Sequence, residues 1–339
     1  MSTHSQTLTS HGDILANVPG ILGFYPQDSL VLAFFKRKED SPQLSLSPLA
    51  RLDLDDAVEM LVNNQDQFTA WSDRFGTDAV IAYVVNSDLS AADDLAKFLL
   101  SEESPLPTVL AIVQVPEITS GTGWWTIHQQ PELSVPRSGE VSEVACSAAL
   151  QQMILDTGQL PALSRHELEA RLDSTEHGID DTEYRGIIED VENYDKPILR
   201  YELQREYEQA TVGISAPTNT RAIRAGLQCF TSPSLRDPLL AALLDEPQEG
   251  LEFAESLMRA VPRDWARMRS QVTATVAVLA QATGQTGLAG VAAHRATELS
   301  ETENFPALVA RTIDLGLGTK LITSVYEGAV KARHILFDA

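Results

Sequence analysis

The sequence is poor in cysteine, in basic side chains and in long apolar runs. Its 339 residues include two cysteines, Cys146 and Cys229, too few for a disulfide framework or a cysteine-ligated zinc site. No apolar stretch approaches the roughly 18 residues that a membrane-spanning helix needs. The polar N-terminal segment lacks the pattern of a secretory signal. We therefore expect a cytoplasmic protein with no membrane association.

Basic side chains are outnumbered 25 to 48 by acidic ones, which gives a net charge of −23. Residues 1–160 hold 7 basic and 21 acidic side chains, residues 161–215 hold 6 and 14, and residues 216–339 hold 12 and 13. Only the last segment is near balance. Because nucleic-acid binding usually needs a positive surface, we expect no nucleic-acid partner and attribute the acidity to solubility.

Motifs for catalysis or cofactor binding are also missing. The histidines show no paired ligand spacing, and no H-E-x-x-H, G-x-S-x-G or Walker sequence occurs. Both cysteines lie in apolar helical segments, a pattern typical of buried packing residues. We expect no metal, no cofactor and no catalytic residue, and a non-enzymatic protein is favoured over an enzyme.

The N-terminal part has the pattern of an α/β domain. Three short apolar runs, residues 30–35, 79–85 and 109–115, are typical of strands buried on both faces of a parallel sheet. Residues 44–54 alternate between apolar and polar, and Pro48 predicts an edge strand that pairs antiparallel with the first run.

Helices are predicted between and beside these strands, at residues 13–22, 56–75, 90–102 and 141–157. The alternation predicts two crossover units. We expect a three-layer α/β domain with a mostly parallel sheet over residues 1–160.

After residue 160 no convincing strand pattern appears. Residues 161–215 are charged and predict an acidic helical connector, and residues 216–339 predict helical hairpins, so the chain is expected to be α/β plus all-α. A tetratricopeptide-like spacing is shared by Val276, Leu279, Ala280, Ala292 and Ala296. A step of 34 residues gives an imperfect second copy at Ala310, Ile313 and Asp314.

A resemblance rests on the segment from Val18 to Val31, VPGILGFYPQDSLV. It is similar to the opening motif of the actinobacterial family called domain of unknown function 4192. Further agreement comes from Gly123-Trp124-Trp125, from Ser164-Arg165-His166-Glu167-Leu168 and from the alanine-rich helices. The resemblance implies an actinobacterial cytoplasmic protein of two parts with no established activity. Many members carry cysteines where this chain has residues 128–132, so no thiol or metal role carries over.

Candidate site residues fall in three groups. The loop of the resemblance offers Gly23, Pro26, Asp28 and Ser29, which we interpret as structural because the loop precedes a strand, whereas ligands in open parallel sheets bind beyond strand ends. Strand-end loops offer possible ligand contacts at Asn86, Ser87, Asp88, Glu117, Thr119 and Ser120. Clustered arginines, which can bind phosphate or carboxylate or pair with the acidic segments, are Arg221, Arg224, Arg263 and Arg267.

Two functions are compatible with these observations. We hypothesise a non-enzymatic adaptor or regulatory protein that binds a protein partner through its helical C-terminal half, since helical hairpins commonly present surfaces to partners. The alternative is a small-molecule or nucleotide-binding protein, which could include an enzyme, that uses the strand-end loops. Nucleic-acid binding through the arginine helices is disfavoured by the net charge.

Overall fold

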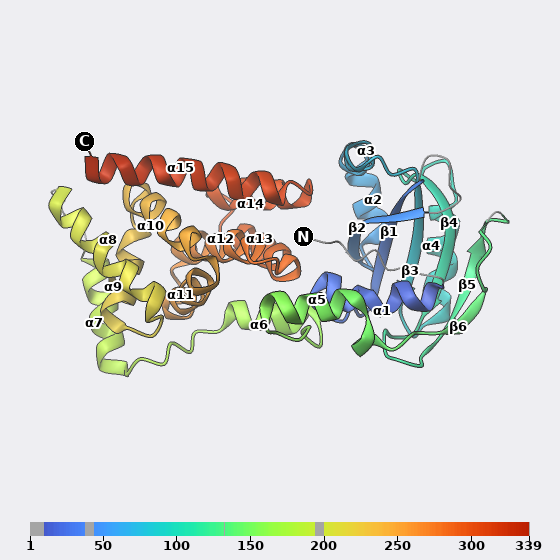
Figure 1. Ribbon diagram of the computed structural model, residues 1–339, viewed down its shortest axis with the longest axis horizontal. Coiled ribbons are helices and arrows are strands. Elements are labelled where there is room, and N and C mark those ends of the chain that lie inside the picture. The colour runs from blue at the N-terminus through green and yellow to red at the C-terminus, as the bar shows by residue number, and fades with distance from the viewer. Residues whose placement is uncertain (1–9, 38–43, 132, 194–199, 339) are drawn as a thin grey trace. The chain divides into compact units, whose positions relative to one another are not determined.

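The chain forms two compact units, residues 1–165 and residues 166–339. The computed structural model describes residues 10–37, 44–131, 133–193 and 200–338. The first unit contains a six-stranded sheet with helices, and the described part of the second consists of helices (Figure 1). The protein is therefore of mixed α/β class.

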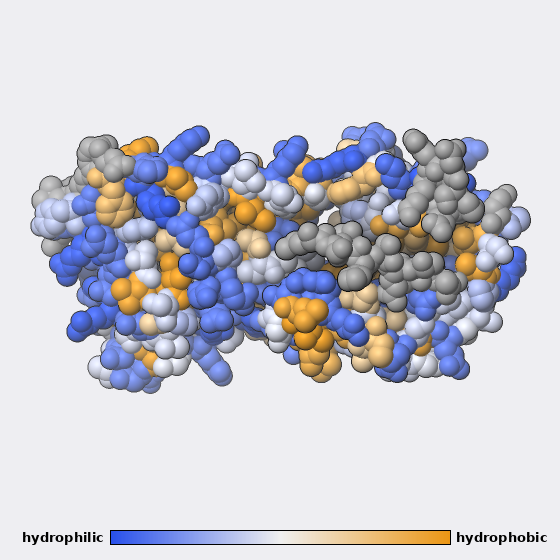
Figure 2. Space-filling model, in the orientation of Figure 1, coloured by the Kyte–Doolittle hydropathy of each residue, from blue (hydrophilic) through white to orange (hydrophobic). Residues whose placement is uncertain are grey.

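Hydrophilic residues dominate the face of the molecule shown in Figure 2. None of the helices in the described ranges combines the length and the apolar character needed to cross a membrane.

The elements of the first unit follow one another with short connections. The strands are β1 (Ser29–Arg37), β2 (Leu44–Asp53), β3 (Ala79–Val85), β4 (Thr108–Val115), β5 (Gly123–Gln129) and β6 (Ser138–Glu140). The helices are α1 (His11–Leu22), α2 (Ala57–Asn63), α3 (Gln65–Phe75), α4 (Leu89–Leu99), the short 3-10 helix η1 (Val144–Cys146) and α5 (Ala148–Thr157). The order of strands in the sheet is β2-β1-β3-β4-β5-β6.

The prediction of a mostly parallel sheet is wrong. Within the described sheet only β3 and β4 pair in parallel, whereas β1 runs antiparallel to both β2 and β3, and β5 runs antiparallel to β4 and β6. A continuous apolar run shows that both faces of a strand are covered, which holds for either strand direction. The predicted antiparallel edge strand is present as β2.

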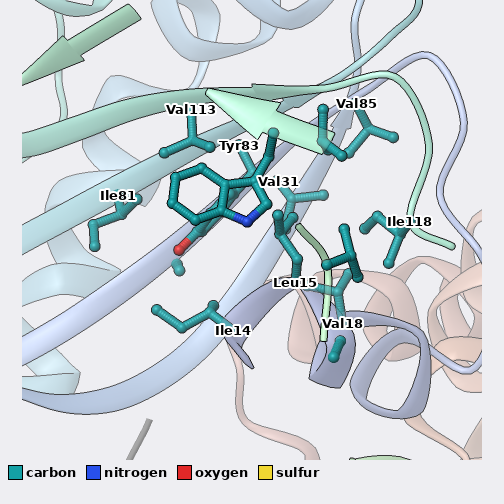
Figure 3. Packing of buried hydrophobic residues seen from close by; sticks show 14 of the residues in the cluster. Ile14, Leu15, Val18, Val31, Ile81, Tyr83, Val85, Val113 and Ile118 are labelled. Carbon is teal, nitrogen blue, oxygen red and sulfur yellow. The ribbon is translucent and has the colours of Figure 1, made fainter. Parts of the chain in front are cut away.

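Two cores cover the two faces of the sheet. On one face Ile14, Leu15 and Val18 of α1 pack against strand residues such as Tyr83 and Val113 (Figure 3). On the other face residues of α2, α3 and α4 pack against Leu30, Leu32 and Phe34 of β1. Burial on both sides explains why these strands are apolar throughout.

Two predicted helices are interrupted. The segment predicted as one helix over residues 56–75 forms α2 and α3, which meet at Asn64, where the side-chain amide donates to the Met60 carbonyl at 2.9 Å. Such local side-chain bonds compete with helix continuation. Likewise, the helix predicted over residues 141–157 begins as η1. Cys146 in η1 is exposed, contrary to our prediction, whereas Cys229 is buried.

The second unit packs helices against one another. They are α6 (Arg165–Asp173), α7 (Asp181–Glu192), α8 (Arg200–Ser215), α9 (Thr220–Cys229), α10 (Pro233–Asp245), α11 (Pro247–Ala260), α12 (Ala266–Ala282), α13 (Thr286–Leu299), α14 (Asn304–Asp314) and α15 (Gly318–Asp338). Helix α12 packs between α11 and α13, and α10 packs against α15. The side chains of α12 from Arg269 to Ala280 are all buried, so this helix is the centre of the unit.

Residues 166–215 belong to this helical unit, which differs from the separate connector predicted over residues 161–215. Helix α6 is tied to the unit by the buried Arg269, whose guanidinium donates to the Leu172 carbonyl at 3.2 Å. Arg295 makes a two-pronged ion pair with Asp173 at the end of the same helix. The buried apolar residues of this segment include Leu168 and Ile187, whereas Tyr201 and Val212 are exposed.

Candidate functional site

The loop before β1 lies at the edge of the sheet where β3 and β4 end. Because β1 runs antiparallel to β3, Ser29 stands opposite Val85, the last residue of β3, and Val85 stands opposite Val115, the last residue of β4. The expectation that this loop is remote from the strand ends assumes parallel strands, and it is wrong because β1 is antiparallel to β3.

At this edge the predicted residues form a hydrogen-bonded network. The Asn86 amide donates to the Asp28 carboxylate at 2.9 Å, and the Asp88 backbone N–H donates to the Asn86 side-chain oxygen. The buried Gln114 amide donates to the Asp88 carbonyl at 3.1 Å. Ser87 is exposed beside them. Asp28 has a φ of 43°, a left-handed conformation that is uncommon outside glycine.

The remaining predicted residues of the loop before β1, Gly23, Pro26 and Ser29, have structural roles. Gly23 ends α1 with a φ of 75°, and its N–H donates to the Pro19 carbonyl at 2.9 Å. Pro26 is buried. The Ser29 hydroxyl accepts from the Arg51 guanidinium at 2.8 Å, so the start of β1 is fixed to β2.

The second predicted strand-end loop, which contains Glu117, Thr119 and Ser120, contacts the segment that begins η1 and not the sheet-edge network. The Ser120 hydroxyl donates to the Glu143 carboxylate at 2.9 Å and accepts from the Val144 N–H at 3.0 Å. Glu117 and Thr119 are exposed. Ser120 therefore fixes the start of η1.

The four predicted arginines occupy different surroundings. Arg224 pairs with Asp190 of α7 at 3.3 Å, and Arg267 pairs with Glu303 at 2.7 Å. Arg221 and Arg263 are exposed. Of the four, Arg267 alone lines the pocket of the helical unit described next.

That pocket has a volume of about 860 Å³, within the range typical of ligand sites. It lies among the α9–α10 junction, the start of α12 and the α13–α14 junction. Its apolar lining includes Phe230, Trp265, Phe305 and Leu308, and its charged lining is Arg236, Asp264, Arg267 and Glu303. We call this site the helical-unit pocket.

Its charged side chains are linked in one network. The Gln271 amide donates to the Glu303 carboxylate at 2.6 Å, and the Gln271 oxygen accepts from Arg236 at 3.4 Å. Arg236 also donates to Asp237 at 2.7 Å, and its guanidinium lies 4.7 Å from the centre of the Phe305 ring. These contacts fix the position of the Arg236 cation.

The arginine cluster visible in the sequence includes Arg267 but none of the other polar residues of the pocket. Arg236, Gln271 and Glu303 come from three elements, and no spacing along the chain predicts that they meet. Within the described ranges, the helical-unit pocket included, no group of three or more histidine, cysteine, aspartate or glutamate side chains is arranged to hold a metal ion.

The sheet unit also contains a buried polar group that the sequence did not reveal. His11 of α1 is 1% exposed, and its Nδ1 lies 3.1 Å from the Tyr83 hydroxyl. Its ring packs edge-on against Trp124 at 5.1 Å between centroids. Burial lowers the pKa of His11 to about 4, so this imidazole is neutral at pH 7.

Comparison with known proteins gives a family without a described activity. No curated protein and no solved structure matches the chain. A family model described as "Domain of unknown function (DUF4192)" matches residues 12–319, a span that includes both the sheet-edge network and the helical-unit pocket. The chain therefore belongs to the DUF4192 family.

Proposed function

We propose that the protein is a non-enzymatic adaptor or regulatory protein of the cytoplasm that binds a protein partner through its helical unit. The observation that carries this proposal is the helical-unit pocket, which is open, of ligand size and lined by apolar and charged side chains. Pockets of this composition are typical of binding sites. Leu308 in its lining is 62% exposed, an apolar anchor available to a partner.

We also propose that α12 and α13 form a tetratricopeptide-like pair, and that the sheet unit is a three-layer domain. Burial of Val276, Leu279 and Ala280 on α12, and of Ala292 and Ala296 on α13, supports the pair. Ala310 of α14, one repeat further on, is buried as well. The two cores on opposite faces of the sheet support the layered arrangement. In such helical pairs the side chains not used for packing are free to bind partners.

The test is affinity purification of the full chain at native expression level, followed by mass spectrometry. We expect a stoichiometric partner to be captured by the wild-type protein and strongly depleted with Leu308→Glu, because a buried carboxylate is costly in an apolar contact. The matched control is Leu160→Glu, which changes a residue that is 73% exposed in the sheet unit. Undiminished capture by Leu308→Glu would refute a partner site in the pocket.

We propose a second function, small-molecule or nucleotide binding at the sheet edge, because one observation favours it. The antiparallel β1 brings Asp28 within hydrogen-bonding distance of Asn86 at 2.9 Å, so the loop of the family motif and a strand end meet. A thermal-shift panel of nucleotides and metabolites tests it. A ligand at 100 times its Kd adds about 2.7 kcal/mol of stability, and a panel without any shift would count against this function.

A further inference from the structure

The polar side chains in the wall of the helical-unit pocket are already bonded to one another. Arg267 pairs with Glu303 at 2.7 Å, and Arg236 pairs with Asp237 at 2.7 Å. Gln271 joins these two ion pairs, because its amide donates to Glu303 and its oxygen accepts from Arg236. The polar wall is therefore held by hydrogen bonds within the unit before any partner arrives.

The formal charges of the pocket lining cancel. Arg236 and Arg267 supply two positive charges, and Asp264 and Glu303 supply two negative charges. An anionic occupant would meet two carboxylates and a cationic occupant would meet two guanidinium groups, and either would give up hydration on entering the pocket. The charge of the lining therefore complements an uncharged occupant.

Three aromatic rings line the pocket without an aromatic partner. Phe230 follows α9, Trp265 precedes α12, and Phe305 lies in the first turn of α14. In the part of the chain that the structure describes, none of the three packs against another ring. Aromatic rings gain affinity from offset or edge-to-face contacts with one another. An aromatic occupant would supply these missing contacts.

The apolar lining continues to a side chain that is open to water. Leu308 is 62% exposed, so an occupant that covers it removes apolar surface from water, which favours binding. The pocket volume of about 860 Å³ is in the range that accommodates whole ligands. A large side chain therefore has room to enter.

We propose that the helical-unit pocket binds an uncharged aromatic side chain of the partner protein, namely phenylalanine, tyrosine or tryptophan. This inference rests on the proposed adaptor function and specifies the chemistry of the group that is bound. Aromatic side chains are frequent among the few residues that dominate the affinity of a protein interface. The ion pairs of Arg236 and Arg267 stay intact in the complex.

The experiment measures the affinity of four small probes for the full-length protein by saturation-transfer NMR titration. The probes are N-acetyl amides of phenylalanine, cyclohexylalanine, lysine and glutamate, which share one backbone. Phenylalanine and cyclohexylalanine carry rings of similar size, but only the first is aromatic. We expect the phenylalanine derivative to bind most tightly, about threefold more tightly than the cyclohexylalanine derivative, because ring–ring contacts add to burial.

Matched variants locate the binding. Trp265→Leu removes one ring of the lining and should weaken the phenylalanine derivative about threefold, whereas Trp125→Leu makes the same change in the sheet unit and should leave Kd unchanged. Leu308→Glu should weaken it about tenfold, because a carboxylate resists burial against an apolar ring, and Leu160→Glu is the control. Thermal melting verifies that each variant is folded.

Four results would overturn the inference. Cyclohexylalanine bound as tightly as phenylalanine would mean that the pocket selects apolar size alone, and tightest binding of the lysine or glutamate derivative would mean that it selects charge. Equal effects of Trp265→Leu and Trp125→Leu would place the binding outside the pocket, and no saturable binding of any probe would leave the pocket without an aromatic site.

Failure of the adaptor function is distinguishable from failure of this inference. If the adaptor function fails, the four probes rank as expected while Leu308→Glu leaves partner capture intact. If the inference alone fails, Leu308→Glu abolishes partner capture while the phenylalanine derivative shows no preference over the other probes.

Discussion

At the scale of single residues, His11 shows how a neutral buried imidazole makes stability depend on pH. Its burial against Tyr83 and Trp124 lowers its pKa from 6.5 to about 4. The unfolded chain therefore binds a proton at this position more readily than the folded one. The contribution of neutral His11 to the free energy of unfolding is fully present above pH 6.5 and is lost as the pH falls towards 4.

We predict that acidification from pH 7 to pH 5 lowers the free energy of unfolding by about 2 kcal/mol through the titration of His11 alone. Urea unfolding at the two pH values, compared between the wild type and His11→Gln, isolates the effect, since the variant lacks the titrating group. A smaller loss on acidification in His11→Gln is expected. An NMR titration of His11 with a midpoint near 6.5 would contradict the prediction.

The candidate site shows what residue-level patterns can and cannot reveal. Arg267 was identified because clustered arginines are visible in the sequence. Gln271 and Glu303, which stand 32 positions apart and are joined at 2.6 Å, carry no such pattern. At the sheet edge, Asn86 and Asp88 were predicted correctly to follow a strand, but the contact of Asn86 with Asp28 depends on strand direction.

At the scale of secondary-structure elements, the close approach of α1 and α5 explains a glycine in the family motif. A Cβ on Gly20 would lie 2.3 Å from the Leu150 nitrogen and 2.5 Å from the Ala149 carbonyl carbon. These are backbone atoms, so neither helix can yield by a side-chain movement. The two helices pack closely only because residue 20 has no side chain.

We predict that Gly20→Ala destabilises the sheet unit by roughly 1–3 kcal/mol, the usual cost of overpacking. Gly290→Ala in α13 is the control, because its Cβ would meet no atom within 4 Å. That change should raise stability by roughly 0.5–1 kcal/mol. Urea unfolding measures both, and a neutral Gly20→Ala would show that the helices can separate at little cost.

The elements themselves were largely predictable, but their directions were not. The apolar runs became β1, β3 and β4, and alternation with Pro48 identified the edge strand β2. The connection from β2 through α2 and α3 passes over β1 to reach β3, so strands that follow one another along the chain need not be neighbours. The hydrophobic periodicity and the composition of a strand contain no information about its place in the sheet.

At the scale of the whole molecule, each unit buries a core of its own. The sheet unit has two clusters on opposite faces, and the helical unit is centred on the buried α12. Domains with separate cores commonly unfold as separate cooperative units.

We predict two distinct unfolding transitions. Three of the four tryptophans, Trp71, Trp124 and Trp125, lie in the sheet unit and Trp265 lies in the helical unit. Tryptophan fluorescence should therefore report mainly on the first unit, while far-ultraviolet circular dichroism should follow the helices. Gly20→Ala should shift the fluorescence transition more than the circular-dichroism transition, because most of the described helices lie in the second unit. Coincident transitions by both probes would mean that the units unfold together.

The two borders of the sheet limit how the protein can associate. In β2 one extra residue opposes β1 between Ala33 and Phe35, and Pro48 lies in that irregular stretch; β6 at the other border is three residues long. An exposed edge strand can pair with a strand of another molecule, and a bulge, a proline or a short edge strand hinders this pairing. Addition of a further strand at either edge of the sheet is thus disfavoured, which counts against fibril-like growth in a concentrated solution.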